Sequence, residues 1–287
     1  MTDSALTGLN VLELGESVAV AYCGRWLAAF GADVTKVEPS AGDWTRRYGV
    51  AAATDAARDM SALFAYLNTG KRSVTQDFDR DSAEAGASLR QRASLADLII
   101  HPFAPADLER LGLGPEARRD AGIGSLIVSV SDFGSDGPYA SYRGAPIVHL
   151  ALGGYLHLSG APDRAPLMLP GFQSEYLGGL HAVIAALALS LDRRLNRPTQ
   201  AEVSLMEVMT SLHQFTTVQF TYEGVNRKRN GNRRENLHPS TLIPCKDGYV
   251  GMALPTNDLW ARQCAMIGQP ELADDPRFAT PAPRPRG

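Results

Sequence analysis

The stretch that decides the fold is residues 10–38, NVLELGESVAVAYCGRWLAAFGADVTKVE. It predicts a strand at 11–14, a helix over 18–30 and a second strand at 33–38, with Gly31 placed to end the helix. Two short β-forming runs separated by a helix of this length are typical of a right-handed βαβ unit. This unit in turn predicts a parallel sheet.

The same alternation of strands and helices continues toward the C-terminus. Beyond the first unit, the pattern predicts a helix over 82–93, a buried strand at 96–100, a short helix near 106–111 and further strands at 125–130 and 200–204. We therefore predict an α/β fold, a Rossmann-like open parallel sheet with helices on both faces, formed by residues 1–200.

Two further regions follow this large domain. We expect 201–225 to be a linker, with a helix from 205 to about 220. Residues 226–287 open with a basic, turn-forming segment and predict a small, incomplete α+β domain, with a strand at 249–254 and a helix over 258–267. Its end, PAPRPRG, is expected to be disordered.

One rim of the predicted sheet gathers the candidate binding residues. In open α/β sheets the ligand crevice lies beyond the carboxyl ends of the strands. The turn at 15–19 should expose backbone N–H groups at a helix N-terminus, which suits an anion such as phosphate. The turn-rich loop 132–139 leaves the fourth predicted strand at the same edge. The side chains expected at this rim are Glu16, Ser17, Lys36, Glu38, His101 and Ser131.

Four cations lie close to this rim in the sequence, namely Arg46, Arg47, Lys71 and Arg72. They form either a solvated face or, if they point toward the 15–19 turn, a site for a phosphorylated ligand held by charge-assisted hydrogen bonds. A nicotinamide cofactor is not expected, because the first βα turn lacks the glycine fingerprint of a dinucleotide site.

Charge and residue composition disfavour several other classes of protein. A formal net charge of -3 gives no basic field for nucleic acid. Cys23, Cys245 and Cys264 are far apart and form no Cys-x-x-Cys pair, and no His/Cys/Asp cluster has ligand spacing, so neither a disulfide framework nor a metal site is expected. The polar N-terminus shows no secretory signal or membrane anchor, and we expect a cytoplasmic protein.

A long apolar helix is predicted within 170–191, PGFQSEYLGGLHAVIAALALSL. Ser174 is a candidate N-cap, and Glu175 lies in the first turn, where the helix dipole favours an anion. The apolar run is too short and too interrupted by polar and glycine residues to span a bilayer. We therefore predict a core helix of a soluble protein, with a carboxylate at its start.

A series of motifs spans nearly the whole chain: LTGLNVLELG, AYCGRWLAAFGADVTKVEPSAGDWTRRYG, LNTGKRSVTQDFD, LERLGLGP, SDFGSDGPYA, EVSLMEV and DPRFAT. Together, and in this order, they resemble the class III CoA-transferase family, also called the CaiB/BaiF family. The resemblance implies a CoA-binding Rossmann-like domain, a smaller second domain and interlocked dimers. It also implies CoA transfer from an acyl-CoA to a small carboxylic acid, through a mixed anhydride and then a CoA thioester on an enzyme carboxylate.

Residue by residue, the resemblance implies both matches and departures. The family's catalytic aspartate falls on Glu175, which adds one methylene, and a misplacement of about 1 Å can cost about a hundredfold in rate. Glu175 is therefore either the acyl-accepting nucleophile or a structural first-turn acid. A CoA-binding arginine of many relatives is Ala104 here. CoA is expected to be held by Ser17, Val18, Lys36, Glu38, Arg46, Asn68, Lys71 and Arg72.

Several functions remain open. The first is an acyl-CoA:carboxylate CoA-transferase that works through Glu175 as a homodimer. The second is a non-catalytic or partner-dependent CoA-binding subunit paired with a full-length paralogue, which the departures at Glu175 and Ala104 favour. An unrelated Rossmann oxidoreductase is third. Racemase chemistry is disfavoured, because 144–146 lacks the paired bases of related racemases, and His149 and His157 are expected to be structural.

Overall fold

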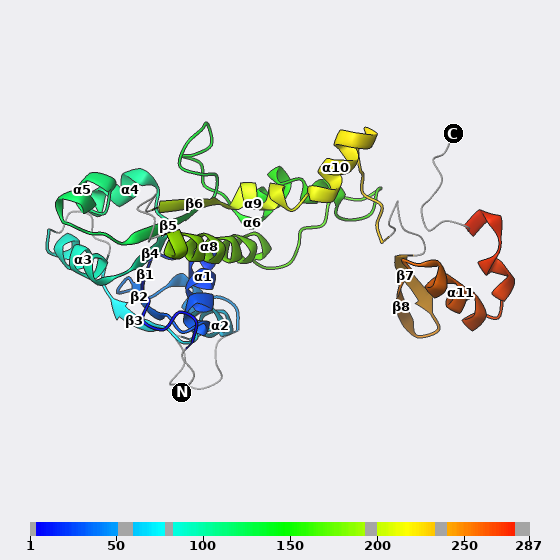
Figure 1. Cartoon of the computed structure of the whole chain (residues 1–287), viewed down its shortest axis with the longest axis horizontal. Helices are drawn as coiled ribbons and strands as arrows, with labels where there is room; N and C mark the ends of the chain where they lie inside the picture. The colour runs from blue at the N-terminus through cyan, green and yellow to red at the C-terminus, as the bar shows by residue number, and fades with distance from the viewer. Residues whose placement is uncertain (1–3, 51–59, 78–82, 193–199, 233–239, 279–287) are drawn as a thin grey trace. The chain divides into compact units, whose positions relative to one another are not determined.

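A computed structural model of the chain describes residues 4–50, 60–77, 83–192, 200–232 and 240–278. The chain forms two compact units (Figure 1), which are unit 1, Met1–Gly153 with Leu169–His213, and unit 2, Gly154–Met168 with Gln214–Gly287. The C-terminal segment PAPRPRG, for which disorder is predicted, lies outside the described residues.

Unit 1 is built on a six-stranded sheet with the order β3-β2-β1-β4-β5-β6. Every neighbouring pair is parallel, so the predicted Rossmann-like open sheet is confirmed. The strands are β1 (Asn10–Leu14), β2 (Asp33–Glu38), β3 (Arg72–Thr75), β4 (Leu98–His101), β5 (Leu126–Ser131) and β6 (Gln200–Ser204). In register, β1 lies between β2 and β4, with Leu12 opposite both Thr35 and Ile99.

Helices cover both faces of this sheet (Figure 1). One face is packed by α1 and α8, whose Val20 and Ala182 join Val11 and Val128 in one buried cluster. The opposite face is packed by α3 and α4, with Leu89 and Leu108 against Leu12 and Ile99. Adjacent strand residues thus point to opposite faces, as the two-residue period of a strand requires. The helices of unit 1 are α1 (Val18–Ala29), α2 (Ala62–Asn68), α3 (Ala83–Leu95), α4 (Pro105–Arg110), α5 (Pro115–Asp120), α6 (Pro146–Leu152), α8 (Gln173–Asp192) and α9 (Leu205–Ser211).

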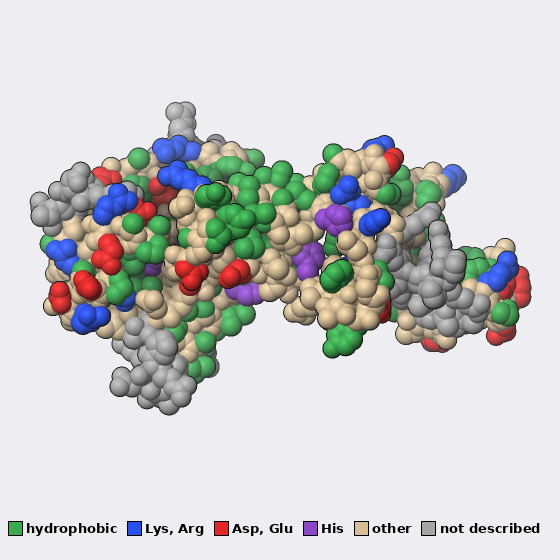
Figure 2. Space-filling model, turned by 90° about the horizontal axis from the view of Figure 1, so that it is seen from above, with side chains coloured by type: hydrophobic (Ala, Val, Ile, Leu, Met, Phe, Trp, Pro, Cys, Tyr) green, Lys and Arg blue, Asp and Glu red, His purple; other side chains and the backbone are tan. Residues whose placement is uncertain are grey.

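The long helix α8 lies in the core of unit 1, as predicted, although a 19-residue stretch of it is long and apolar enough to cross a membrane by length and composition. The expectation that it is too short to span was therefore wrong. Gly179 allows the close contact with α1, because a Cβ there would lie 2.7 Å from the Ala19 carbonyl oxygen. The opposite side of α8 leaves Ile184 and Leu191 exposed, and Figure 2 shows hydrophobic side chains on the surface of unit 1.

Two local predictions differ from the structure. No strand is predicted near the cations Lys71 and Arg72, but Arg72–Thr75 forms the edge strand β3, whose mostly exposed side chains carry no buried pattern. The single helix expected from 205 to about 220 is two helices, α9 and α10 (Gln214–Glu223), which belong to different units. Since Gln200–Ser204 is the last strand of the sheet, the 201–225 region is not one linker helix.

Unit 2 contains both helices and strands. Its two strands, β7 (Ser240–Cys245) and β8 (Gly248–Ala253), form an antiparallel hairpin. Its helices are α7 (Tyr155–Leu158), α10 and α11 (Asn257–Met266), with short 3-10 turns at Pro270–Ala273 and Pro276–Phe278. Its residues 154–168 come from a part of the sequence that was assigned to the large domain, because the chain leaves unit 1 after α6 and returns before α8.

Candidate active site

A cleft of about 850 Å³ opens in unit 1 at the carboxyl ends of the strands. Its lining includes the residues that follow β1, β4 and β5, together with Glu175 of α8. The loop after β5 contributes Asp132 to Ser135, so the expectation that this loop lines the site is met. Of the six side chains expected at this rim, the cleft brings together Glu16, Ser17, His101 and Ser131.

The turn after β1 brings the N-terminus of α1 to the cleft. Gly15 has a φ of +80°, and a Cβ there would lie 2.8 Å from the Pro102 side chain, so only glycine allows this approach. The Ser17 hydroxyl caps α1 by accepting the Val20 N–H at 3.4 Å. Ser17 and Val18 both line the cleft, which places the positive end of the helix dipole beside it.

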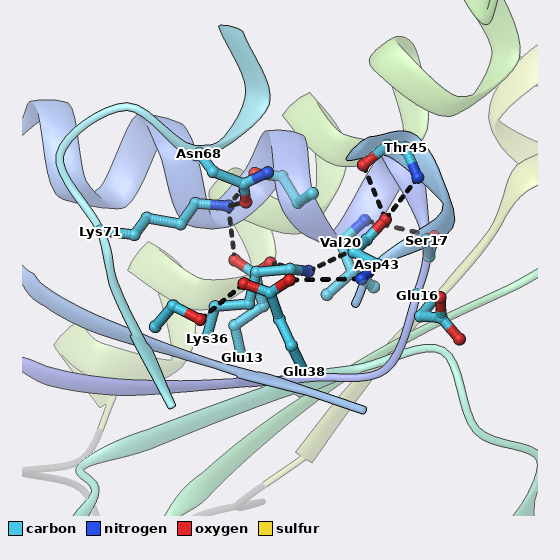
Figure 3. A network of polar contacts seen from close by, with 12 residues as sticks. Glu13, Glu16, Ser17, Val20, Lys36, Glu38, Asp43, Thr45, Asn68 and Lys71 are labelled. Carbon is cyan, nitrogen blue, oxygen red and sulfur yellow. Dashed lines mark hydrogen bonds and ion pairs between the residues drawn. The ribbon is translucent and has the colours of Figure 1, made fainter. Parts of the chain in front are cut away.

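A buried network of ion pairs lies behind this turn (Figure 3). Glu13 in β1 has both oxygens paired, to Lys36 Nζ at 3.0 Å and to Lys71 Nζ at 2.7 Å. Lys36 also meets Asp43 Oδ2 at 2.8 Å, and Asp43 Oδ1 accepts the Thr45 N–H at 2.8 Å. The side chains of Glu13, Lys36, Lys71 and Asp43 are all at most 2% exposed, so two cations and two carboxylates are balanced in the interior.

These partners set the charge states of the network. Burial by itself would lower the pKa of Lys36, but Glu13 and Asp43 outweigh it and raise that pKa above its ordinary value. For Lys71, burial outweighs the attraction of Glu13 and lowers the pKa. Burial would raise the pKa of Asp43, whereas Lys36 and the Thr45 donors lower it.

Glu38 forms a second pair beside this network. Its Oε2 accepts from Arg46 Nε at 2.7 Å and from the Asp43 N–H at 3.2 Å, and its Oε1 accepts from the Ser73 hydroxyl at 2.5 Å. Burial would raise the pKa of Glu38, but these donors, with Arg46 and Ser73 the strongest, lower it to about 2. Glu38 is therefore an anion bound to the protein itself at neutral pH.

The structure separates the eight residues expected to hold CoA. Ser17 and Val18 line the cleft, whereas Lys36, Glu38, Arg46 and Lys71 bind one another or neighbouring acids. Asn68 accepts a hydrogen bond from Lys71 at 2.9 Å, and the exposed Arg72 pairs with Asp33 at the sheet edge. Contact of these last six with CoA stays a prediction.

Glu175 lies in the first turn of α8 and faces the cleft. Ser174 was predicted as the N-cap, but the helix begins at Gln173, and the fully buried Ser174 hydroxyl instead donates to Glu175 Oε2 at 2.6 Å. Ser174 Oγ also meets His149 Nδ1 at 3.2 Å, and His149 Nε2 meets Asp132 Oδ1 at 3.0 Å. Both ring nitrogens of His149 are therefore in hydrogen-bond contact. The sequence gives no sign that Asp132, His149 and the Ser174–Glu175 pair meet, because they come from three separate segments.

His101 is a further polar group of the cleft wall. It is 2% exposed, and its Nδ1 accepts the Phe103 N–H at 3.1 Å, which leaves the ring hydrogen of the neutral form on Nε2. Within the described part of the chain, Nε2 has no hydrogen-bond partner. Burial, followed by the charge of Arg118, lowers the pKa of His101 to about 4, so the ring is neutral at pH 7 and offers a donor.

Metal ligation has no candidate group among the residues that the structure describes. No set of three or more His, Cys, Asp or Glu side chains is placed there to hold a metal ion.

The fold and the cleft define a Rossmann-like α/β protein with a carboxylate at the start of a core helix. Comparison with known proteins extends this, because the model of CoA-transferase family III matches residues 6–286. The chain is 32% identical over 278 residues to the succinyl-CoA–D-citramalate CoA-transferase of Chloroflexus aurantiacus, covering 96% of this chain and 68% of that protein. It is 29% identical to the succinate–glutarate CoA-transferase of Agrobacterium fabrum, covering 96% and 69%.

A solved structure agrees with these sequence relationships. A CAIB/BAIF family protein from Brucella suis superimposes with a TM-score of 0.85 and 31% identity, covering 98% of this chain and 74% of that one. This chain belongs to CoA-transferase family III. The family resemblance of the sequence and the expectation of a CoA-transferase are thereby confirmed.

Proposed function

We propose that this protein transfers CoA from an acyl-CoA to a small carboxylic acid, with Glu175 as the covalent nucleophile. The observation that carries the proposal is the position of Glu175, a carboxylate at the start of a core helix that lines the cleft of a family III fold. Relatives named for succinyl-CoA, citramalate, glutarate and mesaconate support a small carboxylic acid as the acceptor.

Each step of this reaction exchanges one bond for another. A Glu175 oxygen attacks the thioester carbonyl, the carbon–sulfur bond breaks, and CoA leaves as a thiolate while a mixed anhydride forms. The thiolate then attacks the Glu175 carbonyl, which releases the donor acid and leaves a glutamyl-CoA thioester. The acceptor carboxylate attacks this thioester and forms a second anhydride and a thiolate. Attack of that thiolate on the acceptor's acyl carbon yields the new acyl-CoA and frees Glu175.

The cleft offers groups for the anionic stages of these steps. The N-terminal amides of α1 at Ser17 and Val18 and the His101 Nε2–H belong to residues that line the cleft, and we expect these donors to stabilise the negative charge of the reacting carbonyl. The lining that the structure describes holds six carboxylates against two arginines, Arg118 and Arg143, and this excess of negative charge disfavours the CoA phosphates. We therefore place the thioester end of the acyl-CoA in the cleft and the phosphates outside its acidic part. The carboxylates of the lining are Glu16, Asp107, Glu109, Asp132, Glu175 and Glu202.

A second candidate is a partner-dependent CoA-binding subunit. Two relatives favour it, a protein named as the beta subunit of the succinyl-CoA–L-malate CoA-transferase of Chloroflexus aurantiacus, 29% identical, and a subunit of the succinyl-CoA:(R)-benzylsuccinate CoA-transferase of Thauera aromatica, 30% identical. In this proposal a paralogue supplies the nucleophile in a heterodimer, whereas the first proposal is compatible with a homodimer. In both proposals we expect the protein to act in the cytoplasm.

Intact-mass spectrometry after incubation with a panel of acyl-CoA donors tests the first proposal. We expect an acyl or CoA adduct that hydroxylamine removes and that maps by peptide mass to Glu175. The substitution Glu175→Gln should abolish it, because an amide cannot act as the carboxylate nucleophile. The matched control is Glu202→Gln, a carboxylate of the same cleft that accepts from the Ser131 and Ser135 hydroxyls and should leave the adduct in place.

The two candidates give different results. An adduct that survives Glu175→Gln contradicts the assignment of the nucleophile. Absence of any adduct, together with CoA binding in calorimetry, contradicts the autonomous enzyme and supports the partner-dependent subunit.

A further inference from the structure

Glu175 is connected to two buried residues and to a second carboxylate by an unbroken chain of contacts. The chain runs from Asp132 in the loop after β5, to His149 in α6, to Ser174 and then Glu175 in α8. The three contacts measure 3.0, 3.2 and 2.6 Å. Both ends line the cleft, whereas His149 is 1% exposed and Ser174 is 0% exposed. The contact between His149 and Ser174 is therefore shielded from water, and hydrogen bonds are stronger in such an environment.

The donors and acceptors of this chain can be assigned from the hydrogens available. The Ser174 hydroxyl donates its one hydrogen to Glu175 Oε2, so its oxygen can meet His149 Nδ1 only as an acceptor. This requires a hydrogen on Nδ1. The contact of His149 Nε2 with Asp132 Oδ1 then needs one more proton, on the ring or on the carboxyl group. All three hydrogen bonds together therefore hold one proton more than a neutral histidine and two free carboxylates would.

Asp132 holds the far end of this series of contacts. Burial would raise the pKa of Asp132, but the hydrogen bonds from His149 and from the Gly144 N–H outweigh it and lower that pKa. The Asp132 carboxyl group thus holds the Nε2 edge of the His149 ring, while the Nδ1 edge is directed to Ser174 and, through its hydroxyl, to Glu175.

Gly144 shows that the surrounding backbone accommodates this arrangement. Its N–H donates to Asp132 Oδ2 at 2.7 Å, and a Cβ at this position would lie 2.1 Å from His149 Nε2 and 2.8 Å from the Asp132 carboxyl group. Any side chain at 144 would displace the pair. The ring of Phe133 lies edge-on to the His149 ring at 5.9 Å, which restricts its rotation.

We propose that His149 and Ser174 are positioning residues that hold Glu175 Oε2 and so present its other oxygen, Oε1, as the nucleophile. This inference rests on the proposed role of Glu175. It also explains why glutamate serves at this position, because the longer side chain reaches the Ser174 hydroxyl and still lines the cleft. Ser174 itself is no nucleophile, since it is fully buried and is not part of the cleft lining.

The length of the side chain gives a test that a merely structural role would not pass. Glu175→Asp shortens the side chain by one methylene and should break the bond to Ser174, a displacement that costs about a hundredfold in acylation rate. Ser174→Ala should cost at least tenfold in kcat with little change in KM for the acyl-CoA. In the Ser174→Ala background, Glu175→Asp should add far less than it does alone, because the contact is already absent. His149→Asn keeps a donor near the Nδ1 position and should retain most activity, whereas His149→Leu should lose it.

Nitrogen NMR of the imidazoles provides a readout that needs no turnover. At pH 7, we expect the His149 ring to show a protonated Nδ1, and its shifts to change in Glu175→Gln and in Ser174→Ala. The control Glu202→Gln should leave them unchanged. A cooperative thermal unfolding transition, measured for each variant, serves as the control that the variant is folded.

The outcomes separate this inference from the proposed function. His149 shifts that do not respond to Glu175→Gln, or additive effects of Ser174→Ala and Glu175→Asp, overturn the positioning chain even when the wild-type protein forms the adduct. Coupled His149 shifts without any adduct on the wild-type protein support the chain and refute Glu175 as an autonomous nucleophile.

Discussion

Lys71 and Arg72 are neighbours in the sequence, and both are predicted to bind CoA, yet the structure gives them opposite surroundings. The Lys71 side chain is 2% exposed and donates to Asn68 and to the Ala21 carbonyl oxygen in addition to its pair with Glu13 (Figure 3). Arg72 is 67% exposed and pairs with Asp33. The perturbation is Lys71→Met compared with Arg72→Met, two changes that each remove one cation of similar length.

The expected magnitudes differ several-fold. Removing one partner of a buried ion pair leaves an uncompensated charge and costs about 3–5 kcal/mol. Here Glu13 and Asp43 would keep only Lys36 as a counter-charge, so Lys71→Met should lower the free energy of unfolding by about that amount. The melting temperature should fall on the order of 10 °C. For the exposed pair of Arg72, the loss should stay below about 1 kcal/mol.

Urea unfolding followed by fluorescence, with calorimetric titration of CoA on the same variants, measures both quantities. We expect Lys71→Met to be destabilised, with CoA affinity unchanged under conditions where the variant is folded. A Lys71→Met protein as stable as Arg72→Met would refute the structural role of the network. If that protein also bound CoA at least tenfold more weakly, Lys71 would be a ligand-binding residue, as the sequence predicts.

Further predictions concern other parts of unit 1 and one exposed thiol. The pKa of Glu38 is lowered from 4.5 to about 2, which corresponds to a contribution of about 3 kcal/mol to the free energy of unfolding. This contribution is present above pH 4.5 and is lost as the pH falls toward 2, so the stability of Glu38→Gln, measured by acid unfolding, should change less over that range. In urea unfolding, Gly179→Ala should destabilise the protein by about 1–3 kcal/mol, because the new Cβ would meet the backbone of α1. The control Gly124→Ala, with open space around it, should cost little, and equal losses in the two variants would contradict the close packing of α1 and α8. In the native protein, a thiol reagent should label the exposed Cys245 rapidly and Cys23 hardly at all, because burial and then Glu13 raise the pKa of Cys23. Rapid labelling of Cys23 in Cys245→Ser would argue against this burial.

The sequence by itself determined five of the six strands of the sheet. Strands β1, β2, β4, β5 and β6 were predicted because each is a short β-forming run, and most of their side chains are buried. The edge strand Arg72–Thr75 was missed because one of its faces is open to solvent, so no run of apolar residues marks it. The position of the cleft was also predictable, because it follows from the parallel direction of the strands.

Only the tertiary structure decided what the charged residues of the site do. Lys36 and Lys71 appear in the sequence as cations near the rim, and their pairing with Glu13 depends on how three separate segments approach one another. The same is true of His149 and Ser174, which lie 25 residues apart and meet because α6 packs against the start of α8. Spacing along the chain encodes which face of an element a residue occupies, but contacts between elements depend on packing, which the local pattern does not contain.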